Sequence, residues 1–283
     1  PIKRHGLKHV ETAFSEMISA EHIGKLVLEW DCNDSKELKT VFISGGSGFL
    51  AEQLASYYAD KYMVALASRT KFDQLRPSLQ TLIDSHRNIN YFSVDICDDK
   101  ALNRTIQHIT NNYPEISSIV HAAGSHSNEA FINQNGTGLD IAYSAKVNGA
   151  LKLQKLSHKM NISNFILISS ISGFIGSPGQ FSYAMANAFL MDLALERSGV
   201  GLPAKVLILG PYNETSMITG FEKNILFRKK AISPQKISSF LSRYEKLISS
   251  PETLIIDADI NWLSLRNLYD QYSLSTSAFN KFI

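Results

Sequence analysis

The chain has 283 residues, of which 44% are hydrophobic and 19% charged, an ordinary composition for a globular protein with a sizeable core. Its 28 basic and 26 acidic side chains leave a net charge of +2, which gives no reason to expect nucleic acid or an acidic membrane surface as a partner. No apolar run approaches a membrane span, no signal peptide is visible, and Cys32 and Cys97 lack metal-ligand spacing, so we expect a cytoplasmic protein with free thiols and no metal.

The first segment, residues 1–38, does not look like the start of a nucleotide-binding domain. Apolar residues recur at helical spacing over 10–18, and 23–28 predict a turn into a short strand. Residues 31–37 have the composition of a linker, so we place a domain boundary there. Because the chain begins with Pro1 rather than methionine, we expect it to be part of something longer.

A regular alternation of strands and helices begins at Thr40. Short apolar strands are predicted at 41–43, 62–66, 90–94, 116–121, 164–169 and 205–209. Helices are predicted at 50–60, 72–85, 100–112, 139–158 and 183–197. Such alternation implies an α/β fold with a doubly wound parallel sheet covered on both faces and right-handed crossovers.

The pattern loosens after Gly210-Pro211. Residues 215–230 are predicted to form a mobile flap, and Ser233-Pro234 has the residue types of a helix start. A last strand is expected at 254–256. The main domain is therefore placed at residues 39–265, and residues 266–283 are expected to be a polar, aromatic tail.

A glycine-rich turn follows the first strand of this domain. Gly46-Ser47-Gly48-Phe49-Leu50-Ala51 fits the pattern G-x-G-x-x-[GA] between a predicted strand and a predicted helix. The glycines let backbone N–H groups approach a pyrophosphate at a helix N-terminus, so the turn predicts a dinucleotide site. The bulk of Phe49 and the extra methyl group of Ala51 leave the affinity for such a cofactor open.

Three later strand ends carry residues that suit the same cofactor. After the second strand the chain has Ser68-Arg69 in place of an acid, which favours a 2′-phosphate and therefore NADP(H). Asp95, after the third strand, either binds an adenine amino group or caps the next helix. Ala122-Ala123-Gly124, after the fourth strand, offers small residues where a ribose would lie close to the backbone.

The fifth strand leads into paired serines, Ser169-Ser170, and a loop that ends at Tyr183 on the next helix. Hydroxyl groups at the carboxyl end of a buried strand, opposite a tyrosine, are typical of an active site in an open α/β sheet. Because successive side chains of a strand point to opposite faces, we choose Ser170 rather than Ser169.

Together these stretches resemble the short-chain dehydrogenase/reductase family, and more narrowly the ketoreductase domain of polyketide synthases and related fatty acid synthases. The resemblance covers roughly residues 39–260. It rests on Ile43-Ser44-Gly45-Gly46-Ser47-Gly48, Ser68-Arg69, Val94-Asp95, His121-Ala122-Ala123-Gly124, Lys146-Val147-Asn148-Gly149-Ala150, Ser169-Ser170 with Pro178-Gly179-Gln180, and Tyr183 through Leu190.

The resemblance implies a Rossmann fold and four catalytic residues. Most short-chain reductases have lysine four residues after the tyrosine, whereas this chain has Asn187 there and Lys146 on the preceding helix, an exchange similar to that of the ketoreductase subgroup. By resemblance Tyr183 donates a proton, Ser170 binds the substrate carbonyl, Lys146 lowers the pKa of the tyrosine and holds the ribose, and Asn187 orients the relay.

The implied activity is NADPH-dependent reduction of a β-ketoacyl thioester carried on an acyl carrier protein, next to other domains of a megasynthase. The implied cofactor-binding residues are Gly45, Ser47, Gly48, Leu50, Ser68, Arg69, Asp95, Ile96, Ala122, Ala123, Gly124 and Pro211. Residues 1–28 resemble the C-terminal end of an enoylreductase domain, the alternative being a capping helix and strand of the same domain.

Several features leave alternatives open. Family signals for the alcohol configuration are incomplete at His126-Ser127-Asn128, Ile175 and Pro178, so no configuration is predicted. Arg228-Lys229-Lys230 either contacts an acidic carrier protein or is a solvated flap. The alternative to a reductase is a catalytically inactive or epimerising scaffold domain, and a free-standing reductase is disfavoured by the lysine and asparagine exchange.

Overall fold

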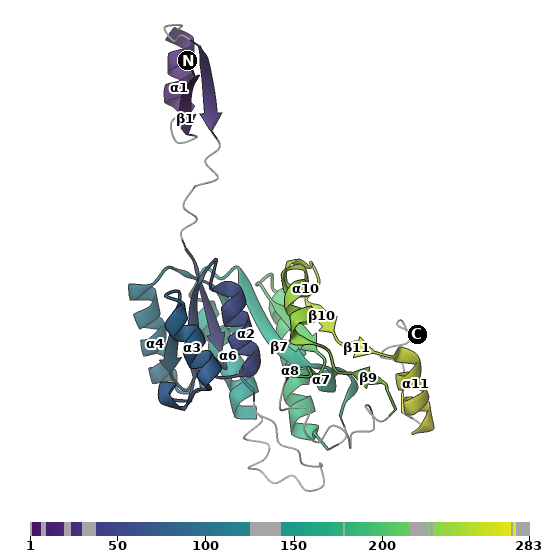
Figure 1. Cartoon of the computed structure of the whole chain (residues 1–283). Coiled ribbons are helices and arrows are strands. Elements are labelled where there is room, and N and C mark those ends of the chain that lie inside the picture. Colours follow the sequence, from purple (N-terminus) through teal and green to yellow (C-terminus); the bar gives the residue numbers. More distant parts are fainter. Residues whose placement is uncertain are drawn as a thin grey trace. The chain divides into compact units, whose positions relative to one another are not determined.

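The computed structural model describes residues 2–6, 10–19, 24–29, 38–124, 143–177, 179–214, 226, 229–272 and 274–275. The chain divides into two compact units, Pro1–Leu38 and Lys39–Ile283, each described by itself (Figure 1). The smaller unit contains β1 (Ile2–Gly6), α1 (Val10–Ser19) and β2 (Lys25–Glu29), and its two strands are parallel. The helix and second strand are confirmed, whereas β1 was not predicted because its sequence IKRHG has no apolar run.

The larger unit is built on a seven-stranded, all-parallel sheet. Its spatial order is β10 (Leu254–Asp257), β8 (Lys205–Leu209), β7 (Asn164–Ser170), β6 (Ile116–His121), β3 (Thr40–Ser44), β4 (Met63–Ser68) and β5 (Ile89–Ser93). The chain therefore starts in the middle at β3, winds outward to β5, and returns to the other side through β6. This order confirms the doubly wound fold and places a topological switch point between β3 and β6.

Helices cover both faces of this sheet (Figure 1). One hydrophobic cluster holds α2 (Phe49–Tyr58), α3 (Pro77–Ser85) and α10 (Ile237–Ser249) on one face. The other cluster holds α4 (Asp99–Asn112), α6 (Gly149–Ser157), the short α7 (Ile171–Ile175) and α8 (Phe181–Gly199). Within the described residues, no helix combines the length and the apolar character needed to span a membrane.

The central strands show why the sequence forms this sheet. All five residues of β3 are buried, Phe42 in one cluster and Val41 and Ile43 in the other. A strand that is apolar on both faces is stable only when both faces are covered. The predicted strands are confirmed at this sheet, with boundaries that differ by one or two residues.

The helix predicted over 72–85 is divided in the structure. A short 3₁₀ turn, η2 (Phe72–Gln74), precedes α3, which begins at Pro77. Proline has no N–H to donate and favours extended backbone at the residue before it, and Arg76 is accordingly extended, with φ −59° and ψ 142°.

The helix start predicted at Ser233-Pro234 is wrong. Ser233 belongs to a short strand, β9 (Ile232–Ser233), and α10 begins only at Ile237. The Glu214 carboxylate accepts a hydrogen bond from the Ile237 N–H at 3.2 Å, so a residue distant in sequence satisfies the first turn of the helix. No local signal carries that information.

The segment after residue 258 is more ordered than expected. It contains β11 (Asp259–Ile260), which pairs with β9 in antiparallel fashion, and α11 (Trp262–Gln271). Leu265 and Leu268 of α11 are buried, so the boundary expected at residue 265 falls within a helix that packs on the core. Among the aromatic residues of this segment, Trp262 and Tyr269 pack against the core, whereas Tyr272 is 55% exposed.

Candidate active site

A cavity of about 930 Å³ opens at the carboxyl ends of the sheet strands. It is the place where open α/β sheets bind ligands, and its size suits a small-molecule cofactor. Every predicted cofactor-binding residue lines it, together with Lys146, Ser170 and Tyr183. Asn187 does not line the cavity and is fully buried.

The glycine turn forms the floor of this cavity. Gly45 has φ +78°, and a Cβ atom there would lie 2.6 Å from the backbone of Ala123. A Cβ at Gly46 would lie 2.8 Å from the Ala67 nitrogen. These two positions therefore require glycine, and they let the turn pass close to the ends of β4 and β6.

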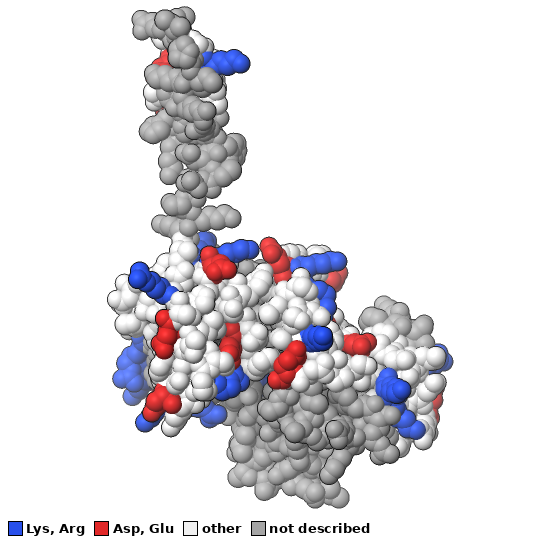
Figure 2. Space-filling model, in the orientation of Figure 1, with Lys and Arg blue, Asp and Glu red and all other residues white. Residues whose placement is uncertain are grey.

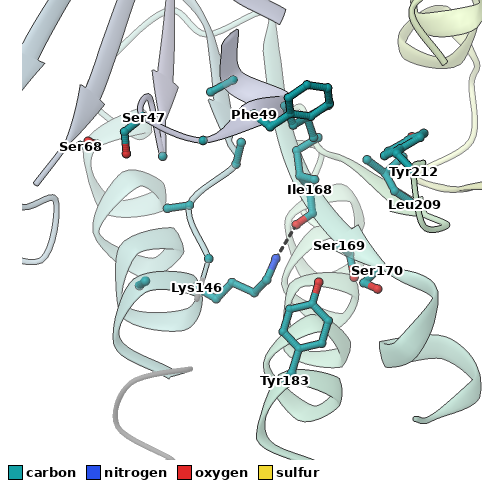
Figure 3. A pocket seen from close by; sticks show the side chains of 18 of the residues that line it. Ser47, Phe49, Ser68, Lys146, Ile168, Ser169, Ser170, Tyr183, Leu209 and Tyr212 are labelled. Carbon is teal, nitrogen blue, oxygen red and sulfur yellow. Dashed lines mark hydrogen bonds between the residues drawn. The ribbon is translucent and has the colours of Figure 1, made fainter. Parts of the chain in front are cut away.

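The N-terminus of α2 faces the cavity. Its N-cap residue is Gly48, and no side chain caps the first turn. The uncapped N–H groups and the positive end of the helix dipole suit an anionic group. Ala51 is 1% exposed and packs in the core, and the Phe49 side chain lines the cavity (Figure 3). A pyrophosphate at this helix end would be bound by the backbone N–H groups, with the Phe49 side chain beside it.

Polar side chains surround the end of β4. Arg69 is exposed at the cavity wall. The Tyr91 hydroxyl donates to the Thr70 carbonyl at 2.7 Å, so the Ser68 hydroxyl must donate to Tyr91, also at 2.7 Å. Thr70 donates to Ser47 at 3.2 Å, which joins this strand end to the glycine turn.

Two further charged residues of this region were not predicted. Arg76 and Glu52 both line the cavity and form an ion pair at 2.6 Å. Glu52 is 8% exposed, and it lies in the first turn of α2. The only feature of the sequence that could have drawn attention to this ion pair is that Arg76 directly precedes Pro77, where a helix begins.

The structure separates the two alternatives for Asp95. The cap of α4 is Asp98, whose side chain accepts from the N–H groups of Lys100 and Ala101. Asp95 lines the cavity and accepts from the Cys97 N–H at 2.9 Å. Asp95 is therefore not the helix cap, and its second carboxylate oxygen remains available to the cavity.

Lys146 lies on η4 (Ser144–Asn148), a π-helical turn that leads into α6. Its side chain is 5% exposed, and its ammonium donates to the Ile168 carbonyl at 2.9 Å (Figure 3). It also lies 5.8 Å from the centre of the Tyr183 ring. Burial lowers the pKa of Lys146 from 10.5 to about 8. The predicted helix over 139–158 is confirmed within the described residues, except that its first turn is wider than an α-helix.

Tyr183 lies in the first turns of α8 and points toward Ser170 and Lys146 (Figure 3). The expected lowering of its pKa is wrong for this structure. Burial is the largest effect and raises the pKa of Tyr183, while hydrogen bonds with Ser170 and Asn187 lower it. The phenol is therefore a weaker acid than the ammonium contact alone would suggest.

The hydroxyl groups of the paired serines have different hydrogen-bond partners. Ser170 caps the short helix α7, and its hydroxyl oxygen accepts from the Ser172 N–H at 3.3 Å. Ser169 donates to the Asn187 carbonyl at 2.9 Å, which joins β7 to α8. The Asn187 side chain donates to the Tyr183 carbonyl at 2.8 Å, and its own oxygen is buried without a hydrogen-bond partner in the described structure.

Some predicted features lie outside the described residues, namely Pro178, His126-Ser127-Asn128, Arg228 and most of the segment 215–230. Ile175 is 7% exposed, and its carbonyl accepts a hydrogen bond from the Tyr269 hydroxyl of α11. α11 therefore contacts the end of α7, the short helix that follows Ser170.

Comparisons with known proteins agree with this fold. A family profile described as KR domain matches residues 39–214. The phenolphthiocerol synthesis polyketide synthase type I Pks15/1 of Mycobacterium marinum is 31% identical over 210 residues, which are 71% of this chain and 10% of that protein. Mycoketide-CoA synthase of Mycobacterium tuberculosis is 27% identical over 278 residues, which are 95% of this chain and 7% of that protein.

Among solved structures, the ketoreductase PlmKR1 from the first module of phoslactomycin biosynthesis in Streptomyces sp. HK803 matches with a TM-score of 0.77 and 28% identity. The match covers 87% of this chain and 58% of that one.

The strand order and the glycine turn at its centre define an oxidoreductase of the short-chain dehydrogenase/reductase class. Within that class, the chain belongs to the KR family, the ketoreductase domains of polyketide synthases.

Proposed function

We propose that this domain uses NADPH to reduce a β-ketoacyl thioester, carried on an acyl carrier protein, to the β-hydroxyacyl thioester. The observation that carries the proposal is a single cavity with the glycine turn at one side and Lys146, Ser170 and Tyr183 at the other. A dinucleotide bound across the turn would bring its reactive end to these three side chains.

The cofactor preference is proposed from the strand ends. Arg69 lies at the cavity wall after β4, and the backbone of Gly45 and Gly48 and the start of α2 lie beside it. An arginine guanidinium pairs with a phosphate through charge-assisted hydrogen bonds, which favours the 2′-phosphate of NADPH over the free hydroxyl of NADH. Asp95 and Ile96 would contact the adenine side, and Ala122-Ala123-Gly124 and Pro211 the ribose and nicotinamide side.

The chemistry needs one hydride and one proton. When bound, NADPH would supply the hydride for the carbonyl carbon. Ser170 donates a hydrogen bond that orients the ketone oxygen, and Tyr183 transfers its phenolic proton to that oxygen. The Lys146 ammonium stabilises the phenolate left on Tyr183, which then regains a proton from solvent. Asn187 holds the backbone of the tyrosine turn.

Acyl carrier protein is proposed as the partner because the relatives are polyketide synthases, of which the chain spans a small part. On the described part of the face drawn in Figure 2, acidic and basic side chains of the larger unit are interspersed. Recognition there would depend on shape and on the tethered substrate more than on one charged patch.

Residues 1–28 are proposed to be the end of a preceding enoylreductase domain. They form part of a unit separate from the reductase, with a β1-α1-β2 crossover and parallel strands. Phe14, Met17 and Ile18 of α1 are 49%, 51% and 81% exposed, as expected of a helix separated from the body it packs on.

The proposal is tested by NADPH consumption with a β-ketoacyl thioester or trans-1-decalone as substrate. Tyr183→Phe removes the proton donor and should lower kcat by about 10²–10⁴-fold while the affinity for NADPH, measured by fluorescence titration, stays unchanged. Tyr57→Phe, at a half-buried position of α2 that contacts α10 outside the cavity, is the matched control and should keep wild-type turnover.

The outcomes separate the alternatives. A wild-type protein that binds NADPH but reduces no substrate would support an epimerase or a scaffold domain. A protein that does not bind NADPH would contradict the cofactor assignment itself. Comparable turnover in the Tyr183→Phe variant and the wild type would remove Tyr183 from the mechanism.

A further inference from the structure

His121 is a buried titratable residue to which the mechanism above gives no role. It is the last residue of β6, its side chain is 0% exposed, and it lies beside Ser44, the last residue of β3. Its Nδ1 is 2.7 Å from the Ser44 hydroxyl oxygen, and its Nε2 is 2.9 Å from the Lys146 carbonyl oxygen. Both ring nitrogens are therefore engaged.

The partners fix the tautomer of this imidazole. A carbonyl oxygen only accepts, so Nε2 carries the hydrogen that is donated to Lys146. Burial lowers the pKa of His121 to about 4, so the ring is neutral near pH 7 and Nδ1 has no hydrogen. The Ser44 hydroxyl must then donate to Nδ1, and the chain of donation runs from Ser44 through His121 to the backbone of Lys146.

The backbone that His121 contacts is the widened turn η4. There the Gly149 N–H donates to the carbonyls of both Ser144 and Lys146, which departs from the regular α-helical pattern. The ring reaches this turn because position 149 has no side chain: a Cβ there would lie 3.1 Å from His121 Cε1 and 2.6 Å from Ile96 Cδ1. A histidine and a glycine from distant elements thus fit one another at the turn.

The Lys146 side chain is held equally closely. It passes over Gly124, where a Cβ would lie 3.1 Å from Lys146 Cε, and ends at the Ile168 carbonyl. A small displacement of the η4 backbone would therefore move the ammonium away from both Ile168 and Tyr183. Misplacing a catalytic group by about 1 Å can cost about 10²-fold in rate.

We propose that His121 is a positioning residue for the reductase, which fixes η4 so that Lys146 reaches Ile168 and Tyr183. Its contact with Ser44, directly before the glycine turn, ties the position of Lys146 to the cofactor side of the cavity. The functional part of this inference rests on the proposed reductase activity.

The test compares two variants at one position with one control. His121→Leu removes both hydrogen bonds and should lower kcat by about 10–100-fold. His121→Gln keeps an N–H donor at about the position of Nε2 and should restore turnover to within about fivefold of wild type. Val120→Ala, on the same strand but facing the opposite cluster, is a control for disturbance of the buried strand and should keep wild-type kcat per folded molecule.

A double-mutant cycle tests whether His121 acts through Lys146. Lys146→Met should lower turnover strongly, and adding His121→Leu to it should cost little more, because the group that His121 positions is already absent. The effects of the two substitutions on thermal stability should instead be nearly additive. A crystal structure of His121→Leu should show Lys146 Nζ displaced from the Ile168 carbonyl, a readout that needs no turnover.

The results are decisive in both directions. If His121→Leu loses no more activity than Val120→Ala, or if the two losses multiply in the cycle, His121 is only a core residue and the inference is overturned. If the wild type reduces no β-keto substrate, the proposed function fails on its own, and the position of Lys146 in the variant structure still decides the inference.

Discussion

Lys146 illustrates at the scale of a single residue how a position with a proposed catalytic role costs stability. Its ammonium is buried with one carbonyl as a partner, and its pKa falls from 10.5 to about 8. A shift of that size corresponds to a penalty on the order of 3 kcal/mol for the charged form in the folded protein. In the proposed mechanism this penalty is the cost of holding the ammonium near the Tyr183 ring.

Lys146→Met should therefore be more stable than the wild type at pH 7. The folded-state pKa lies below the unfolded one, so between about pH 8 and 10.5 the unfolded chain holds more protons at this position. Wild-type stability from this group consequently rises with pH across that window. The advantage of the variant, measured by urea unfolding at pH 7 and pH 9.5, should shrink as pH rises. A constant difference would show that the amine titrates normally.

Arg69 determines the cofactor preference in the proposed function. Arg69→Ala should raise the KM for NADPH by about 10–100-fold, because a charge-assisted hydrogen bond is worth roughly 1.5–3 kcal/mol. The KM for NADH should not change, since it has no 2′-phosphate. Arg87→Ala, an exposed arginine outside the cavity, is the control. Equal losses with both cofactors would refute the assignment.

At the residue level, the lining of the cavity could be predicted where the signal was local. Gly45, Gly48 and Ala123 could be placed in the cavity because glycine and alanine spacing after a strand reflects close backbone approach. The rise in the pKa of Tyr183 could not be predicted from the sequence, since it depends on how deeply the phenol is buried in the folded protein. The bonds of His121 to Ser44 and Lys146 join three separate elements and leave no local pattern.

At the scale of elements, the contact between α7 and α8 sets the distance from Ser170 to Tyr183. Gly173 of α7 lies against α8, where a Cβ would be 2.7 Å from Asn187 Cβ and 2.8 Å from the Ala188 nitrogen. The two helices can therefore approach only because position 173 has no side chain.

Gly173→Ala should push these helices apart. The expected result is a loss of about 1–3 kcal/mol in the free energy of unfolding, together with a lower kcat per folded molecule. Gly199→Ala, at the end of α8 with no atom within 4 Å of its Cβ, should be neutral or slightly stabilising. Chemical denaturation and steady-state kinetics of both variants provide the comparison. A stable, fully active Gly173→Ala protein would contradict this account of the helix contact.

The elements themselves could be predicted as far as each one follows its own periodicity. Strands β3, β6, β7 and β8 form apolar runs, and α4 repeats Leu102, Ile106 and Ile109 at helical spacing. The start of α10 and the strand β9 depend instead on Glu214 and on β11, which lie far away in sequence. The elements that could not be predicted from the sequence are therefore those whose bounds depend on tertiary contacts.

For the whole molecule, the two compact units predict independent folding. A shortened chain of residues 39–283 should unfold within about 1 kcal/mol of the full chain, which is about 2–4 °C in Tm. Its kcat/KM for a β-keto substrate should also stay the same, since every cavity residue belongs to the larger unit. Calorimetry of both proteins measures the difference in Tm, and steady-state kinetics measure kcat/KM. A large loss of stability would show that residues 1–38 are a capping part of the reductase.

The hydrogen bond from Tyr269 to the Ile175 carbonyl has a practical consequence for recombining domains. Through it, and through buried Leu265 and Leu268, α11 is joined to the end of α7 and to the core. A junction for grafting this domain elsewhere therefore belongs after α11. A graft that ended at β10 would carry every residue that lines the cavity and still lack these contacts of α11.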